Sequence, residues 1–220
     1  MLELRNVSYH PATAAQPVLR DVSLTVPAGR VALVAGRSGS GKTTLLDVIS
    51  GLAEPSSGTV LWEGQPLNGR QRRWLCGLVF QFPERHFLGL SVGQELKLGH
   101  RRLTADQAQE VLTLVGLEGL SLQQAPEQLS GGQQRRLALA VQLLRNPRVL
   151  LLDEPTAGLD WAVRGEILEL LAALAQERAV LVVTHEPDLF RGVSNDGWRL
   201  EQGVLQQPIL TMPSPQDGEP

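Results

Sequence analysis

The sequence predicts an α/β fold built on a parallel sheet, and the main evidence is a pair of buried strands joined by a helix. Residues 149–152 and 179–183 are continuous apolar runs, as expected for strands covered on both faces. Between them, apolar side chains recur at helical spacing, at Val163, Ile167, Leu170, Leu171 and Leu174. A strand, a helix and a strand in this order imply a right-handed crossover and a parallel α/β core.

Other segments extend this core in both directions. Short β-rich runs occupy residues 2–7, 22–26, 31–35, 59–62 and 77–80. Residues 196–200 and 203–205 predict a final hairpin. The tail, residues 207–220, carries four prolines and is expected to be disordered.

A helical insertion interrupts the strands at about residues 84–146. This stretch has few β-branched residues, and Thr104 with Gln107 fits a helix capping box. We therefore predict one domain, residues 1–206, that contains a helical subdomain at about 84–146.

Composition excludes several classes of protein. The 220-residue chain has 23 acidic and 20 basic side chains, a net charge of −3, which gives no overall footprint for binding nucleic acid. Its one cysteine, Cys76, excludes an intrachain disulfide and a cysteine-cluster zinc site. The sequence has no apolar run of about 18 residues and no signal-peptide core at its start, so we expect a cytoplasmic protein. If it acts at a membrane, another chain must supply the membrane part.

The strongest motif is a phosphate-binding loop. Gly36, Arg37, Ser38, Gly39, Ser40, Gly41, Lys42 and Thr43 match G-x-x-x-x-G-K-[ST], and Thr44 follows. The motif lies between a predicted strand and the apolar helix 45–49, the context that separates it from a chance glycine-rich turn. Backbone N–H groups and the helix dipole attract phosphate, Lys42 reaches the terminal phosphates, and the Thr43 hydroxyl suits Mg²⁺. This motif therefore predicts a loop that binds nucleotide phosphates together with Mg²⁺.

Two further features support a nucleotide site. Asp153 and Glu154 end the buried strand 149–152, where ligands bind in parallel sheets, so Asp153 suits Mg²⁺ and Glu154 suits a general base. Ser130 is placed to cap a helix that begins with two glycines, which makes a second anion site without a lysine. Taken alone, the first feature equally fits two solvated carboxylates, and the second fits a plain capped helix.

The stretch Leu129, Ser130, Gly131, Gly132 and Gln133 reads LSGGQ, and with it the chain resembles the ATP-binding cassette (ABC) transporter family. The motifs run in that family's order from Tyr9 to His185. The resemblance implies a P-loop core whose sheet is mostly parallel, with antiparallel N-terminal strands and an inserted helical subdomain. It also implies roles for single residues: Tyr9 stacks on adenine, Gln81 contacts Mg²⁺ and water, Asp160 lies in a loop between subunits, and His185 contacts the γ-phosphate.

The same resemblance implies partners. Two subunits form a head-to-tail homodimer or heterodimer, and Ser130, Gly131, Gly132 and Gln133 of one cover the ATP on the other. The dimer drives a transmembrane partner from the inner face of the cell membrane. Trp161 departs from the family pattern, which has a small residue or proline after the aspartate.

The stretch Phe80, Gln81, Phe82, Pro83 and Glu84 resembles the ATPases of energy-coupling-factor and cobalt-type importers. It favours import of a vitamin, a metal ion or a similar micronutrient. The alternative is a soluble ABC ATPase without a transport role, such as one that assembles iron–sulfur clusters or another cofactor. A DNA-repair ABC ATPase would need a long coiled coil between Lys42 and Ser130, and a P-loop kinase would not need the Ser130 site. The chain has 18 arginines but only two lysines, Lys42 and Lys97, so Lys42 marks a position where arginine does not serve.

Overall fold

The computed structural model of the chain describes residues 1–100, 102–194 and 196–206. The predicted tail, 207–220, lies outside the described residues. The main sheet has six strands in the order β10-β9-β3-β8-β7-β6. These strands are β3 (Val31–Ala35), β6 (Cys76–Val79), β7 (Val149–Asp153), β8 (Ala179–Thr184), β9 (Asp196–Glu201) and β10 (Val204–Gln206). Every neighbouring pair is parallel except β9 and β10, which form the predicted hairpin.

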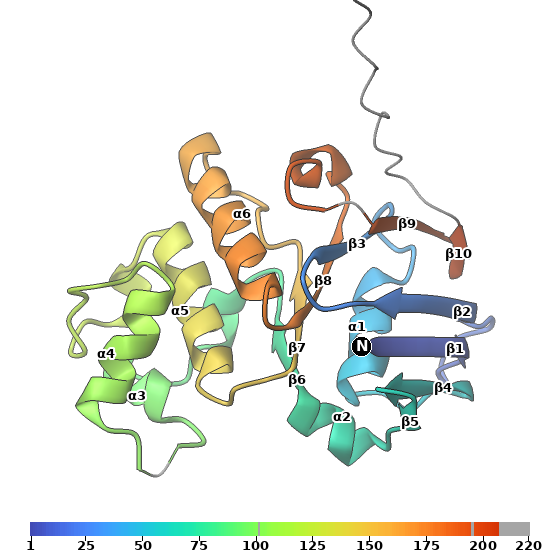
Figure 1. Cartoon of the computed structure of the whole chain (residues 1–220), viewed down its shortest axis with the longest axis horizontal. Coiled ribbons are helices and arrows are strands. Elements are labelled where there is room, and N and C mark those ends of the chain that lie inside the picture. Colours follow the sequence, from blue (N-terminus) through green and yellow to red (C-terminus); the bar gives the residue numbers. More distant parts are fainter. Residues whose placement is uncertain (101, 195, 207–220) are drawn as a thin grey trace, which may run out of the picture.

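A second, antiparallel sheet lies beside the first (Figure 1). Its strands, in the order β2-β1-β4-β5, are β1 (Leu2–Tyr9), β2 (Leu19–Val26), β4 (Ser57–Trp62) and β5 (Gln65–Pro66). The predicted α/β fold with both kinds of sheet is confirmed. The strands β1 and β2 are longer than the sequence indicated, because pairing between them continues to Tyr9 and Leu19.

Helices occupy both faces of the main sheet. They are α1 (Lys42–Ser50), α2 (Gly69–Leu75), α3 (Val92–Lys97), α4 (Ala105–Leu114), α5 (Gly131–Leu143) and α6 (Trp161–Ala175). Short 3₁₀ helices cover Pro83–His86, Pro126–Gln128 and Pro187–Phe190. The helix α2 escaped the sequence analysis because it is short and polar, although Asn68 and Gln71 form a capping box at its start.

The buried strands explain how two hydrophobic cores fit in one domain. In β7, Leu150 and Leu152 pack into the core shared with α3 to α6, whereas Leu151 packs into the core shared with α1 and the antiparallel sheet. Successive side chains of a strand point to opposite faces, so a continuous apolar run serves both cores. Figure 1 shows the result, with α3 to α5 at one end and the antiparallel sheet at the other.

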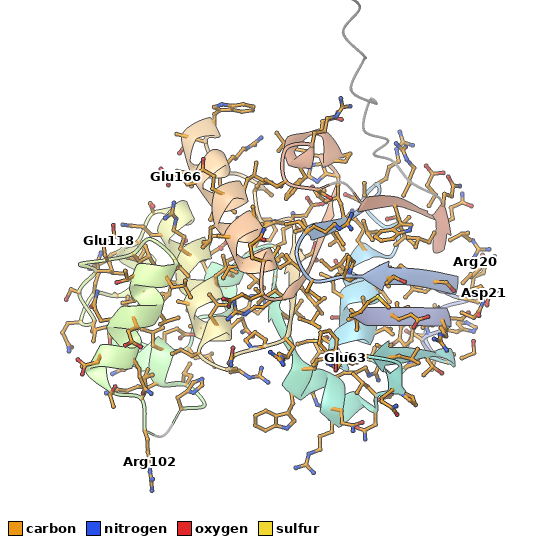
Figure 2. The ribbon with its side chains drawn as sticks, in the orientation of Figure 1. Arg20, Asp21, Glu63, Arg102, Glu118 and Glu166 are labelled. Atoms are coloured by element: carbon orange, nitrogen blue, oxygen red, sulfur yellow. The ribbon has the colours of Figure 1, made fainter. Side chains whose placement is uncertain are left out.

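Charged side chains such as Arg102 and Glu118 point outward from this body (Figure 2), and Glu63 is exposed as well. Within the described ranges, no helix is long and apolar enough to cross a membrane.

Candidate nucleotide-binding site

The phosphate loop connects β3 to α1, as the motif predicts. The helix α1 begins after Gly41, whose φ of 106° lies in the left-handed region that glycine tolerates. At Gly36 a Cβ atom would lie 2.5 Å from Ser40 Oγ and 2.6 Å from the carbonyl oxygen of Leu200. These two glycines let the chain fold back tightly enough to direct backbone N–H groups into one hollow.

The Ser40 side chain has a hydroxyl group inside the phosphate loop that the described residues leave unsatisfied. Its Oγ atom is buried, and nothing in the described part of the chain forms a hydrogen bond with it. Buried hydroxyl groups are normally paired, because an unpaired one loses its bonds to water. The Ser40 hydroxyl is therefore an unsatisfied polar group inside the loop.

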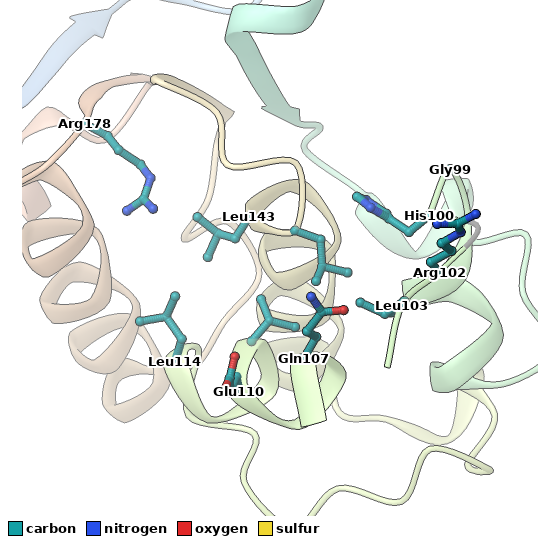
Figure 3. A pocket seen from close by; sticks show the side chains of 11 residues that line it. Gly99, His100, Arg102, Leu103, Gln107, Glu110, Leu114, Leu143 and Arg178 are labelled. Carbon is teal, nitrogen blue, oxygen red and sulfur yellow. The ribbon is translucent and has the colours of Figure 1, made fainter. Parts of the chain in front are cut away.

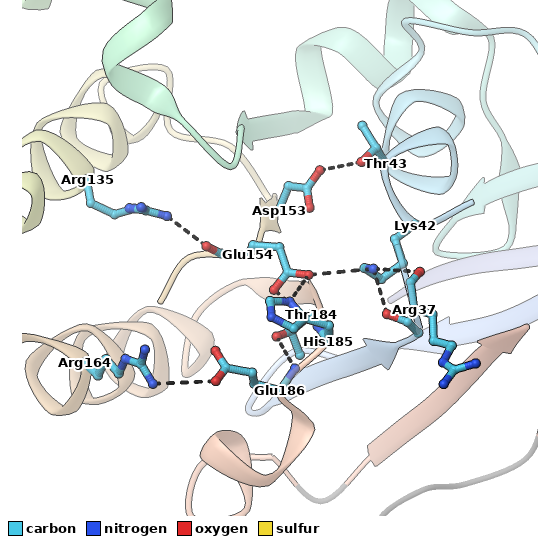
Figure 4. Close-up of polar contacts among 11 residues, drawn as sticks. Arg37, Lys42, Thr43, Arg135, Asp153, Glu154, Arg164, Thr184, His185 and Glu186 are labelled. Carbon is cyan, nitrogen blue, oxygen red and sulfur yellow. Dashed lines mark hydrogen bonds and ion pairs between the residues drawn. The ribbon is translucent and has the colours of Figure 1, made fainter. Parts of the chain in front are cut away.

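Lys42 lies inside the loop and is only 8% exposed. Its Nζ atom donates to the carbonyl oxygens of Gly36, at 2.8 Å, and Arg37, at 3.2 Å. It also lies 3.7 Å from Glu154 Oε1 (Figure 4). The charge is thus held at the mouth of the loop by groups that a polyphosphate can replace.

Thr43 and Asp153 form a second pair beside Lys42. The Thr43 hydroxyl donates to Asp153 Oδ2 at 2.7 Å, which joins the first turn of α1 to the end of β7. Burial raises the pKa of Asp153, and the Glu154 charge also raises it, while the Thr43 hydrogen bond and the Lys42 charge lower it. Two adjoining oxygen ligands, one a carboxylate that lacks a full counter-charge, match the preference of Mg²⁺.

In the described ranges, no group of three or more His, Cys, Asp or Glu side chains is arranged to hold a metal ion. A cation beside Thr43 and Asp153 would therefore need oxygen atoms from a nucleotide or from water. This agrees with the usual way in which Mg²⁺ binds to phosphates.

Glu154 occupies a constrained position at the centre of the site. Its φ is 47°, a left-handed value that is uncommon for a residue with a side chain. Its N–H donates to the carbonyl oxygen of Val183 at 2.9 Å. The carboxylate accepts from the His185 backbone N–H at 3.2 Å and lies 2.8 Å from His185 Nδ1. This backbone geometry fixes the carboxylate between Lys42 and His185 (Figure 4).

Strand register explains why these distant residues meet. Asp153 pairs with Val183, and Ala35 pairs with Thr184, so the phosphate loop, Glu154 and His185 leave the sheet at one edge. Val79 pairs with Leu152, which places Gln81 at the same edge. Gln81 is half-buried, and its side chain makes no hydrogen bond among the residues that the structure describes.

Arg135 helps to hold the backbone of the site in place, and the sequence analysis missed it. It is 5% exposed, and its guanidinium donates to the carbonyl oxygens of Glu154, at 2.8 Å, and Ala157, at 2.9 Å. Burial lowers its pKa, and the nearby Glu84 carboxylate opposes that shift. A signal was available, because Arg135 lies at helical spacing from Gly132, Leu139 and Leu143 on the buried face of α5.

Tyr9 ends the strand β1 and is half-buried. It pairs with Leu19, whose Cδ2 atom lies 3.2 Å from the position of a Cβ on Gly41. The antiparallel sheet thus brings Tyr9 towards the phosphate loop.

Ser130 to Gln133 lie apart from the phosphate loop, at the start of α5. Ser130 and Gln133 form a capping box, with hydrogen bonds of 2.9 and 3.3 Å. A Cβ on Gly132 would lie 2.6 Å from Val163 Cγ1, so α5 and α6 pack closely there. Asp160 caps α6, because its Oδ1 atom accepts a hydrogen bond from the Val163 N–H at 3.0 Å. The Trp161 side chain takes no part in this cap and is exposed.

A separate hollow of about 660 Å³ lies between α4, the end of α5 and Arg178 (Figure 3). None of the predicted site residues lines it. It is therefore not part of the nucleotide site.

Comparison with known proteins agrees with this geometry. Residues 19–157 match the ABC transporter family. ABC transporter I family member 11, chloroplastic, of Arabidopsis thaliana is 38% identical over 95% of this chain and 82% of its own length. The energy-coupling factor transporter ATP-binding protein EcfA2 of Symbiobacterium thermophilum is 42% identical over 82% of this chain and 67% of its own length.

Solved structures are similar over nearly the whole chain. CbiO1 from Clostridium perfringens, part of the ABC transporter complex cbiONQ, has a TM-score of 0.83 and 29% identity over 94% of this chain and 86% of its own. The ATP-binding cassette MJ0796, seen as a dimer in a post-hydrolysis state bound to ADP and Pi, has a TM-score of 0.79 and 29% identity over 94% and 97% of the two chains. These matches confirm the resemblance inferred from the motifs: the chain belongs to the ABC transporter family, as one of its ATP-binding subunits.

Proposed function

We propose that this chain binds ATP with Mg²⁺, hydrolyses it to ADP and phosphate, and uses the reaction to drive a membrane partner that imports a micronutrient. The observation that carries the catalytic part is the Glu154 carboxylate, held 2.8 Å from His185 Nδ1 and 3.7 Å from Lys42 Nζ at the edge of the phosphate loop. A buried carboxylate beside the terminal phosphates is placed to accept a proton from attacking water.

The surrounding residues divide the remaining work. Lys42 and the N–H groups of residues 36–44 bind the phosphates, and Tyr9 stacks on the adenine. Thr43, Asp153 and Gln81 would hold Mg²⁺, which supplies positive charge to the phosphate oxygens. His185 keeps a hydrogen bond with Glu154 through one ring nitrogen, which leaves the other available to the γ-phosphate.

The active form is a head-to-tail dimer of ABC subunits. Ser130 to Gln133 make a capped helix N-terminus that attracts anions but lies apart from the phosphate loop of its own chain. In the dimer, this motif would bind the phosphates of the ATP held by the second subunit. Asp160 lies in the adjoining loop. The dimeric, ADP-bound MJ0796 cassette supports such an arrangement.

The importer assignment rests on the residues after β6. Phe82 and Glu84 are exposed beside Gln81, so they can bind a partner helix and sense it next to the site. EcfA2 and CbiO1 are named as parts of transporters, which supports a place on the inner face of the membrane. Co-purification of the tagged chain from membranes tests this. Transmembrane subunits are expected, whereas exclusively soluble partners would favour the cofactor-assembly alternative.

The catalytic proposal is tested with Glu154→Gln. The amide keeps the shape of the side chain but cannot accept the proton, so ATP turnover should fall by about a hundredfold or more while ATP binding persists. Turnover is measured as phosphate release, and binding is measured by calorimetry.

Glu186→Gln is the matched control, because Glu186 also follows β8 but faces Arg164, at 3.7 Å, instead of the phosphate loop. This variant should keep most of the ATPase activity. Near-normal turnover in Glu154→Gln would remove Glu154 from the role of general base.

A further inference from the structure

We propose that Trp161 of one copy of the chain docks into an arginine-lined cavity beside the phosphate loop of a second copy, in the ATP-bound dimer. This inference rests on the head-to-tail dimer proposed above. It identifies a contact specific to this chain that would stabilise that dimer.

Trp161 is the first residue of α6, and it is 79% exposed. Its ring has no aromatic or cation–π partner among the described residues, whereas the other exposed tryptophan, Trp74, has the Arg145 guanidinium 5.7 Å from its ring centre. An aromatic side chain buries roughly 150–250 Å² when covered, so docking Trp161 would contribute substantially to an interface. A single exposed aromatic residue is ordinary, however, and its position must identify the partner.

The position of Trp161 is fixed next to the LSGGQ motif. Leu159 Cδ2 lies 3.7 Å from the position of a Cβ on Gly131, and Val163 Cγ1 lies 2.6 Å from that of Gly132. Residues on both sides of Trp161 therefore touch the start of α5. In the proposed dimer the start of α5 covers the phosphate loop of a second copy, and this would bring Trp161 to the surface beside that loop.

A cavity of about 840 Å³ opens at that surface. It is lined by the phosphate-loop backbone of residues 36–40 and by His185, which are assigned above to the nucleotide. The side chains of Arg20, Arg37, Arg199 and Glu201 also line it, and these are the groups that we assign to Trp161. Arg20 donates to the Gln202 carbonyl oxygen, Arg199 lies 3.6 Å from Glu201, and the Arg37 guanidinium points away from Lys42 and Glu154 (Figure 4).

The chemistry of the two surfaces is complementary. Guanidinium groups bind the face of an indole ring, and such contacts strengthen when water is excluded. The Asp160 carboxylate, which precedes Trp161, brings a negative charge to the same positively charged cavity. The two-fold relation of such a dimer would form the contact twice.

The test measures dimerisation of the Glu154→Gln protein with ATP, by sedimentation. Trp161→Ala in this background should weaken the dimer by about tenfold or more, as for an aromatic residue central to an interface. Trp74→Ala is the matched control and should leave dimerisation unchanged, since Trp74 is 69% exposed on α2.

A second variant tests the cavity itself. Arg199→Gln should also weaken the dimer, and its effect should be largely lost once Trp161 is replaced, because contacting residues are not additive. Independent effects would place Trp161 outside the cavity and overturn the assignment. If Trp161→Ala dimerises as tightly as the control, the inference is wrong and the proposed dimer stands. If the Glu154→Gln protein stays monomeric with ATP, the proposed dimer and this contact are both refuted.

Discussion

Arg135→Met should separate stability from catalysis more clearly than any other change. The substitution removes two hydrogen bonds, to the carbonyl oxygens of Glu154 and Ala157, and keeps a long apolar stem on the buried face of α5. The Glu154 oxygen keeps a hydrogen bond from the Ala157 N–H, at 3.1 Å, so only the Ala157 oxygen loses its partner. A buried acceptor left without a partner costs about 1–3 kcal/mol. The substitution also removes the desolvation penalty of a buried guanidinium, whose pKa is lowered by burial, and this offsets part of the lost stability. We therefore expect the free energy of unfolding to fall by about 1–3 kcal/mol, which a domain of this size can tolerate.

The effect on catalysis should exceed the effect on folding. Glu154 adopts a φ of 47°, and Arg135 is the side chain that binds its carbonyl oxygen. Without this bond, the backbone can relax towards ordinary angles and move the carboxylate away from His185. Displacement of a catalytic group by about 1 Å can cost about a hundredfold in rate. We expect a loss of at least tenfold in turnover for the folded protein, with a smaller change in affinity for ATP.

Arg72→Met is the control. Arg72 is as deeply buried as Arg135 and donates to the Val48 carbonyl oxygen at 2.5 Å, but at the end of α1 that is remote from the phosphate loop. Urea unfolding of the ligand-free proteins gives the stability, and phosphate release under saturating ATP gives the turnover. Both variants should lose stability, and only Arg135→Met should lose turnover per folded molecule. Equal turnover in the two variants would refute the positioning role of Arg135.

Two further predictions concern the charges of the site. Asp153→Asn should raise the free energy of unfolding of the ligand-free protein at pH 7 but abolish Mg²⁺-dependent hydrolysis. Burial raises the pKa of Asp153, so its ionised form costs stability; this cost is absent below the unfolded pKa of about 3.9 and complete above the folded pKa. The extra stability of Asp153→Asn over the parent protein should therefore shrink as the pH falls from the folded pKa to the unfolded pKa. Urea unfolding at several pH values measures this difference, and a variant that is less stable than the parent at pH 7 would contradict the prediction. Lys42→Arg should lower ATPase activity by about tenfold or more, because a planar guanidinium does not fit where the compact Nζ contacts two loop carbonyls. Lys97→Arg, at the exposed second lysine, is the control. Equal ATPase activity in the two variants would contradict this reason for keeping lysine at position 42.

The local sequence predicted the order of most elements and most of the candidate catalytic residues. The phosphate loop depends on glycine, lysine and threonine at fixed spacing, and the strands of the main sheet are continuous apolar runs because both of their faces are covered. Such patterns follow from contacts within a few residues or from burial alone, so they can be read without a structure. The carboxyl ends of parallel strands necessarily meet at one edge, which is why Asp153 and Glu154 could be assigned to the nucleotide site. The assignment of His185 came from the family resemblance.

Only the tertiary structure decided what holds that site in place. Arg135 binds the Glu154 carbonyl from α5, and Thr43 joins Asp153 across 110 residues of sequence. The Ser40 hydroxyl without a partner among the described residues, the left-handed Glu154 backbone and the exposure of Trp161 at the start of α6 likewise depend on which elements pack together. Side-chain pairing between distant segments has no periodic signature in sequence, because it is fixed by helix packing and strand register. The sequence therefore determined which candidate catalytic side chains the chain carries, and the packing of α5 and α6 against the sheet determined how those side chains are positioned.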